Sequence, residues 1–193
     1  MSAPLPAAQT ALQARLLQHR EELTRRWIDV VHGTYPFETI GFLRTRKDRF
    51  MNPVGHRTDE AAQAVIDAVL TPEVDESALG KALEEIVRVR AVQDFPPETA
   101  IGMFFALKDI LRTHLAADTG SEAYAPALRG LETRIDAIVL MAFGAYARCR
   151  EKLFRMKVEE TQRRYSQIVR LARKYGDVPE TPENPGPGHP EGA

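Results

Sequence analysis

Cysteine is almost absent from this sequence, in which Cys149 is the single thiol. One cysteine cannot build a disulfide framework within the chain or a Cys-based zinc or iron–sulfur site, and such usage is typical of a reducing compartment. The five histidines include no His-x-x-x-His or His-Glu-x-x-His pair, the spacings that place two metal ligands on one helical face. We therefore expect a cytoplasmic protein without a metal site.

An excess of charge of one sign is also lacking. The 26 Lys and Arg residues nearly balance the 27 Asp and Glu residues, which leaves a formal net charge of -1. No overall field therefore attracts nucleic acid or an anionic membrane. The longest strongly apolar run, residues 137–145, is far shorter than the about 20 residues that span a bilayer, and residues 1–8 do not resemble a signal peptide. We expect no membrane partner and no export by the general route.

Familiar catalytic motifs are missing as well. The sequence contains no Gly-x-Gly-x-x-Gly, no Walker loop and no Gly-x-Ser-x-Gly, so phosphate cradles and the hydrolase nucleophile elbow are not expected. We predict that the protein is not an enzyme, that it has no catalytic residues and that it carries no cofactor.

What the sequence has in abundance is helical periodicity. Apolar residues recur at spacings of three and four along most of the chain, and no segment shows the alternation typical of a strand. The pattern predicts an all-α fold with helices over 7–31, 40–51, 59–70, 75–94, 97–115 and about 124–175. Gly and Pro predict turns over 32–36 and 52–55, and the Pro- and Gly-rich residues 176–193 predict a disordered tail.

The long helix predicted at the end of the chain has two parts. In the first part, small and apolar residues alternate at steps of three and four, as along the seam of a coiled coil. The seam consists of Leu128, Leu131, Ile135, Ile138, Ala142, Ala145 and Cys149. After a phase shift near Leu153 and Met156, similar spacing resumes with Thr161, Tyr165, Ile168, Ala172 and Tyr175. Because an exposed apolar seam gains free energy by burial, we expect it to form a homodimer and to transmit a change of state.

The second part of this helix carries the main charge asymmetry of the chain. Residues 148–174 contain ten basic residues and three glutamates. Such a surface is most often a solvated helix face whose side-chain stems cover apolar surface. A nucleic-acid-binding regulator that uses this basic helix is kept as an alternative, although nucleic acid is not the partner that we expect.

One group of charged residues interrupts predicted apolar faces. Arg88, Arg90 and Asp94 lie at the end of the 75–94 helix, and Lys108 lies within the 97–115 helix. A charged group on a buried face needs a partner, because desolvation of an isolated charge is costly. We predict that Arg90, Asp94 and Lys108 form a network. The network either fixes helix packing or binds an anionic ligand.

Three stretches of the sequence resemble a known family. They are Ile40 to Phe50 leading into Asn52-Pro53-Val54-Gly55, then Ile86 to Pro96, then Ala106 to Leu111. Over about half of the chain, from Leu12 to Lys108, the pattern is similar to the N-terminal domain of RsbRD-type RsbT co-antagonist proteins. These are relatives of the non-haem, globin-like sensor domains of stressosome RsbR proteins.

The resemblance implies a helical, dimeric, non-enzymatic sensor module of bacterial signalling, whose last helix leads to an output domain. Only the Pro- and Gly-rich tail follows Tyr175, so we expect a stand-alone sensor or adaptor without a STAS domain. We expect a globin-like domain over 1–150, a basic helical extension over 151–175 and the tail over 176–193. The partners would be a second copy and a downstream signalling protein.

The order and length of the predicted helices also resemble the globin family. A haem-binding or small-molecule sensor or carrier is therefore an alternative. Residues 57–113 contain no histidine, so the usual proximal ligand of haem is missing. Only His32 or His56 could serve, and in another geometry.

Overall fold

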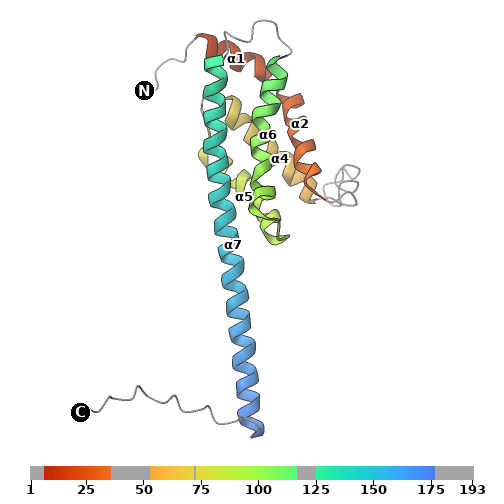
Figure 1. The fold of residues 1–193 in the computed structure, drawn as a ribbon, viewed down its shortest axis with the longest axis vertical. Coiled ribbons are helices and arrows are strands. Elements are labelled where there is room, and N and C mark those ends of the chain that lie inside the picture. Colours follow the sequence, from red (N-terminus) through yellow and green to blue (C-terminus); the bar gives the residue numbers. More distant parts are fainter. Residues whose placement is uncertain (1–6, 36–52, 72, 117–124, 177–193) are drawn as a thin grey trace, which may run out of the picture. The chain divides into compact units, whose positions relative to one another are not determined.

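The computed structural model describes residues 7–35, 53–71, 73–116 and 125–176, and this part of the chain forms six α-helices and no strand (Figure 1). The helices are α1 (Ala7–Gln18), α2 (Arg20–Gly33), α4 (Pro53–Leu70), α5 (Glu76–Val92), α6 (Pro97–Ala116) and α7 (Ala125–Tyr175). The predicted all-α class is confirmed. The helix predicted over 40–51 lies outside the described residues, as does the tail predicted over 176–193 except for Gly176.

Two predicted boundaries are wrong. The helix predicted over 7–31 is divided at His19, where the amide of His19 donates to the carbonyl of Leu16 at 3.0 Å. Buried leucines keep the helical spacing on both sides of this break, so the apolar pattern could not reveal it. The turn predicted over 52–55 is also wrong from its second residue on, because α4 begins at Pro53. Proline is favoured in the first turn of a helix, where its missing amide is not needed.

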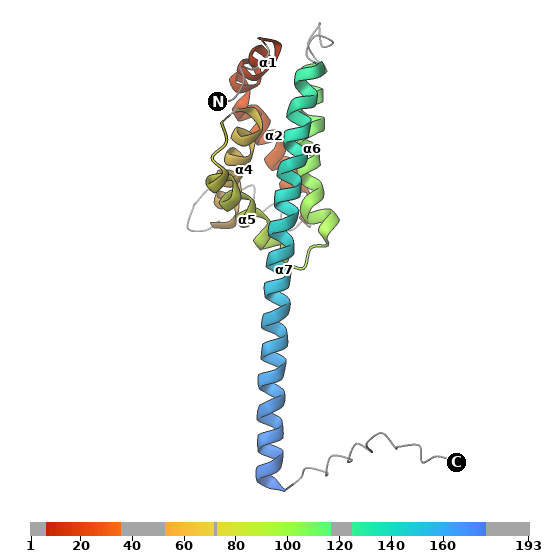
Figure 2. The same cartoon turned by 90° about the vertical axis from the view of Figure 1, so that its left-hand side faces the viewer.

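The chain divides into two compact units, residues 1–151 and 152–193. In the first unit, α1, α4 and α5 lie on one side, and α6 with the first part of α7 lies on the other (Figure 2). α4 packs against both α5 and α2, and α2 also packs against α6. Helix α2 therefore links the two sides of this unit.

The core of the first unit is centred on an aromatic pair between α2 and α6. The rings of Trp27 and Phe104 are 5.4 Å apart, and both side chains are fully buried. The indole Nε1 of Trp27 donates to the carbonyl of Met103 at 2.9 Å. This bond satisfies the polar atom of a buried indole, so the pair fixes the position of α2 on α6.

Charged side chains attach α7 to its neighbours in the first unit. Lys108 of α6 pairs with Asp136 at 2.6 Å, and Arg112 of α6 pairs with Glu132 at 2.7 Å. Arg134 donates to the carbonyl of Val69 at 3.0 Å, and to that of Thr71. Val69 lies in the last turn of α4, whose carbonyls lack internal donors, and Thr71 follows the helix. Burial lowers the pKa of the Arg134 guanidinium from its ordinary value, because desolvation penalises the charge.

The second unit contains the last part of α7, residues 152–175. Its described side chains are exposed, except for three of intermediate exposure, Leu153, Val169 and Ala172. Within the described ranges, no helix combines the length and the apolar character that crossing a membrane requires.

The two adjacent phenylalanines of α6 allow a test of the core. Phe104→Ala should lower the free energy of unfolding by about 3–5 kcal/mol, because it leaves a cavity beside Trp27. Phe105 is 47% exposed, so Phe105→Ala should cost less than about 1 kcal/mol. Urea denaturation measures both changes. Equal losses would contradict the assignment of the buried face of α6.

Candidate transmission site at the end of α5

The end of α5 has the hydrogen bonds of a Schellman motif. The amide of Phe95 donates to the carbonyl of Arg90 at 3.0 Å, and the amide of Asp94 donates to the carbonyl of Ala91 at 3.3 Å. Asp94 has a φ of 63°, and it is the one described non-glycine residue with a positive φ. This left-handed position normally takes Gly or Asn. Asp also tolerates this conformation, and here its carboxylate forms an ion pair with Arg150 of α7.

Arg90 lies beneath this turn and is 1% exposed. Its Nη2 donates to the carbonyl of Val31 at 3.2 Å and to the hydroxyl of Thr34 at 3.0 Å, and its Nη1 donates to the hydroxyl of Tyr35 at 3.4 Å. The guanidinium carbon is 5.0 Å from the centre of the Tyr35 ring and 5.8 Å from that of Phe95. Arg90 thus joins the end of α5 to the end of α2.

The partners of Arg90 in the described part of the chain are neutral. Burial lowers the pKa of its guanidinium from the ordinary value, because desolvation penalises the charged form. Its Nε has no hydrogen-bond partner among the described residues. The charge is instead balanced by two hydroxyls, one carbonyl and the faces of two aromatic rings.

Two residues of α7 bind the same turn from the other side. The hydroxyl of Tyr146 donates to the carbonyl of Phe95 at 2.6 Å, and Tyr146 is 4% exposed. Arg150 forms an ion pair with Asp94 and donates to the carbonyl of Ala91 at 3.2 Å. A cation at the C-terminal end of a helix is favourable. The hydrogen bond and the charge of Asp94 raise the pKa of Arg150.

The network predicted for Arg90, Asp94 and Lys108 is replaced by separate partnerships. Arg90 binds the end of α2, Asp94 pairs with Arg150, and Lys108 pairs with Asp136. Arg88 is exposed, and its Nη2 lies 3.8 Å from Oε1 of Glu85. Lys108 pairs with a residue of α7, and Arg90 with the end of α2, so the prediction of one shared network is wrong. The use of these residues for binding or transmission remains a prediction.

The seam predicted for dimerisation is mostly enclosed by the chain itself. Leu128 and Cys149 have intermediate exposure. The other five residues are at most 3% exposed: Leu131, Ile135, Ile138, Ala142 and Ala145. The expectation that this face is open to a second copy is therefore corrected, because its apolar side chains form part of the core of the first unit. Its role in transmission remains a prediction.

Four residues of the site were not predicted to belong to it. Thr34 and Tyr35 follow α2, and Tyr146 and Arg150 belong to α7. The one available signal was the position of Arg150 at the start of the basic region. Nothing in the spacing could indicate that it pairs with a residue 56 positions earlier.

No candidate metal centre is found in the described ranges. They contain no group of three or more His, Cys, Asp and Glu side chains that could hold a metal ion. His32 is 6% exposed at the end of α2, and the side chain of His56 lies outside the described residues.

A comparison with protein families gives a match over most of the first unit. Residues 21–161 match the model of the RsbT co-antagonist protein rsbRD N-terminal domain. The chain belongs to this family. The match includes the described helices from α2 to the middle of α7, with Arg90, Asp94, Tyr146 and Arg150. The rsbRD N-terminal family is one of stressosome-like signalling sensor domains and is not known for enzymatic activity.

The chain is also similar to an uncharacterised protein from Archaeoglobus fulgidus. The two are 26% identical over 149 residues, which cover 74% of this chain and 85% of the relative. This relative is archaeal, so similar sequences are not limited to the bacterial setting that the resemblance implied. No solved structure gives a significant match.

Variants of Asp94 separate its backbone role from its ion pair. Asp94→Asn should lower the free energy of unfolding by less than about 1 kcal/mol, because the pair with Arg150 is exposed and Asn tolerates the left-handed conformation. Asp94→Val should cost about 1–2 kcal/mol more. Thermal and urea denaturation measure both, and Asp94→Gly is the control without backbone strain. A Val variant as stable as the Asn variant would contradict the positive φ.

Proposed function

We propose that this protein is a non-enzymatic, dimeric sensor or adaptor module, in which α7 relays the state of the first unit to a protein partner. The observation that carries the proposal is the set of contacts from the end of α2, through Arg90 and the turn after α5, to Tyr146 and Arg150 of α7. Its single cysteine supports a cytoplasmic location as part of this proposal.

The physical basis of the relay is that the turn after α5 contacts both the end of α2 and α7. Phe95 packs its ring against Tyr35, at 5.3 Å between centroids, and offers its carbonyl to Tyr146. A displacement at the end of α2 would move Arg90 and the Phe95 ring together, because packed groups cannot shift independently. The same displacement would alter the bonds that Tyr146 and Arg150 make. A signal that favours one arrangement of the α2 end would thereby reach α7.

A groove on the first unit, which shares only Ala145 with the predicted seam, supports dimerisation. It has a volume of about 570 Å³ and lies between α5 and α7. It is lined by Gly80, Leu83, Ala137, Leu140, Met141, Gly144, Ala145 and Arg148. Leu140 is 71% exposed, Met141 is 41% exposed and the nearby Phe143 is 48% exposed.

A second copy fits this face because the hollow and the large side chains lie on one surface. A two-fold interface joins the same patch on both subunits, so a patch needs both a recess and something to fill it. Gly80 leaves room for a partner helix, since a Cβ there would have no atom within 4 Å. Contiguous exposed apolar surface of this kind is typical of an interface.

The dimer is tested by light scattering at micromolar concentration. The chain should have twice the monomer mass of 21.6 kDa, and Leu140→Arg should reduce it to the monomer, because it places a charge in the apolar patch. Val92→Arg is the control, since Val92 is 63% exposed on α5 but does not line the groove. A monomeric parent chain, or a dimer indifferent to Leu140→Arg, contradicts this part of the proposal.

The relay is tested by amide hydrogen exchange. Arg150→Gln removes the ion pair with Asp94 and should accelerate exchange of the Phe95 amide about fivefold, the equivalent of a surface pair of about 1 kcal/mol. The acceleration should extend to the Tyr35 amide, which donates to the carbonyl of His32. Arg129→Gln, at an exposed position near the start of α7, should change neither. A change confined to the neighbours of Asp94 would contradict the relay.

A further inference from the structure

The second unit presents an apolar seam that is separate from the buried face of α7. Seven residues of this unit follow alternating steps of four and three over three heptads: Phe154, Val158, Thr161, Tyr165, Ile168, Ala172 and Tyr175. Phe154, Tyr165, Ile168 and Tyr175 are each between 63% and 75% exposed. A helix with such a seam is stabilised when a second helix covers it, because each apolar side chain then leaves water.

The positions beside this seam are basic or neutral. When Val158 is assigned to position a of the heptad repeat, the e positions are Arg155, Gln162 and Val169. The g positions are Lys157, Arg164 and Leu171. Residues 152–176 contain eight basic residues and two acidic ones. The two acidic residues, Glu159 and Glu160, pair along the helix with Arg163 and Arg164. The flanks of the seam therefore offer cations and no carboxylate.

This charge pattern determines which helix fits the seam. In a coiled coil the e and g residues of one helix lie beside those of the other, and opposite charges there select the partner. In a parallel pair of copies, Lys157 would lie beside Gln162 and Arg164 beside Val169, so neither cation would gain an ion pair. An antiparallel pair would place e beside e and g beside g, where the second copy again offers no carboxylate. A helix with Glu or Asp at e and g would instead form ion pairs on both sides. The charges favour an acidic partner over self-pairing.

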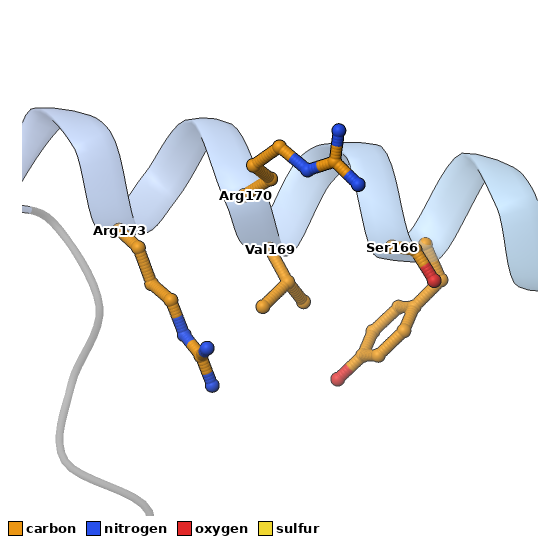
Figure 3. Close-up of a pocket in the computed structure, with 5 residues that line it drawn as sticks. Ser166, Val169, Arg170 and Arg173 are labelled. Atoms are coloured by element: carbon orange, nitrogen blue, oxygen red, sulfur yellow. The ribbon is translucent and has the colours of Figure 1, made fainter.

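A hollow on the surface of the second unit adds a place for a carboxylate. It has a volume of about 300 Å³ and is lined by Tyr165, Ser166, Val169, Arg170 and Arg173. Figure 3 shows the side chains of Val169 and Arg173 directed to the same side of the helix. The methylene groups of a Glu side chain could lie on Val169 while its carboxylate binds Arg173.

Nucleic acid explains these features less well. Phosphate groups need cations and backbone donors, and they do not require an apolar seam of fixed heptad spacing. The aromatic residues Phe154, Tyr165 and Tyr175 could stack on bases, but Val158 and Ile168 lie between them in the seam and offer no stacking surface. The regular spacing therefore favours a helix as the ligand.

We infer that residues 152–175 bind an acidic amphipathic α-helix of a partner protein, with the apolar seam as its core and the arginines and lysines at its edges. The inference rests on the proposed function, because it names the chemistry of the partner to which α7 relays its signal. A helix is the recognition element, and its required features are apolar residues at a and d and carboxylates at e and g.

The probe is a synthetic helical peptide of about 24 residues with Leu and Ile at a and d and Glu at e and g. Fluorescence anisotropy measures its binding to the full chain, and the same peptide with Lys at e and g is the reference. We expect the Glu peptide to bind at least about tenfold more tightly than the Lys peptide, and to bind less tightly at higher salt.

Two matched pairs of variants assign the binding to the seam. Ile168→Glu should weaken binding of the Glu peptide about tenfold or more, because it removes an apolar side chain that the peptide would cover and adds a repulsive charge. Gln167→Glu adds the same charge outside the seam and should have a much smaller effect. Arg164→Glu should likewise weaken binding more than Arg163→Glu, although both arginines pair with a glutamate four residues earlier. Circular dichroism verifies that all four variants remain helical.

Four outcomes would overturn the inference. The Lys peptide could bind as well as the Glu peptide, or neither could bind. Ile168→Glu could halve the mass of the chain in light scattering, which would assign the seam to a second copy. Finally, a labelled RNA of about 24 nucleotides could bind more tightly than the Glu peptide and be weakened equally by Ile168→Glu and Gln167→Glu, which would indicate phosphate binding. If the peptide tests fail but the dimer still depends on Leu140, the proposed dimer stands and only this inference falls. If the Leu140→Arg test fails, the proposed dimer falls, and peptide binding is judged by the variants of Ile168 and Arg164.

Discussion

A buried guanidinium without an acidic partner among the described residues is the constraint on which the first unit depends. Arg90 is 1% exposed, and its guanidinium is stabilised by hydrogen bonds to Val31, Thr34 and Tyr35. Because a buried charge loses its hydration, any movement that broke these bonds would be costly. The end of α2 and the end of α5 are thus held together, and the turn at Phe95 acquires a defined position from which α7 can be bound.

Helix α7 uses its apolar residues differently in the two units. In the first unit, residues such as Ile135 and Ala142 are buried within the chain's own core. In the second unit, Phe154 and Ile168 are more than half exposed. The change of phase near Leu153 in the sequence therefore marks a change of role. The face that stabilises the first unit ends there, and the exposed face that we propose as the partner surface begins.

Local chemistry made much of the fold predictable. Asp75 caps α5 by accepting from the amides of Ser77 and Ala78 at 3.0 and 2.9 Å, and Pro97 begins α6. Both ends agree with the helix starts predicted at 75 and 97. The break at His19 was not predictable because the apolar spacing continues across it. The candidate site was predictable only in part. Arg90 and Asp94 were recognised as anomalies, but their partners are distant in sequence.

The sequence by itself determined the all-α class, most helix ends, the basic character of the last part of α7 and the resemblance to the rsbRD N-terminal family. These properties follow from periodicity, capping residues and composition, which act over a few residues. Only the tertiary structure decided that Lys108 pairs with Asp136, that Arg150 pairs with Asp94, and that Leu131 and its seam are buried. An amphipathic helix can bury its apolar face against its own chain or against another, and the spacing of its residues is the same in both cases.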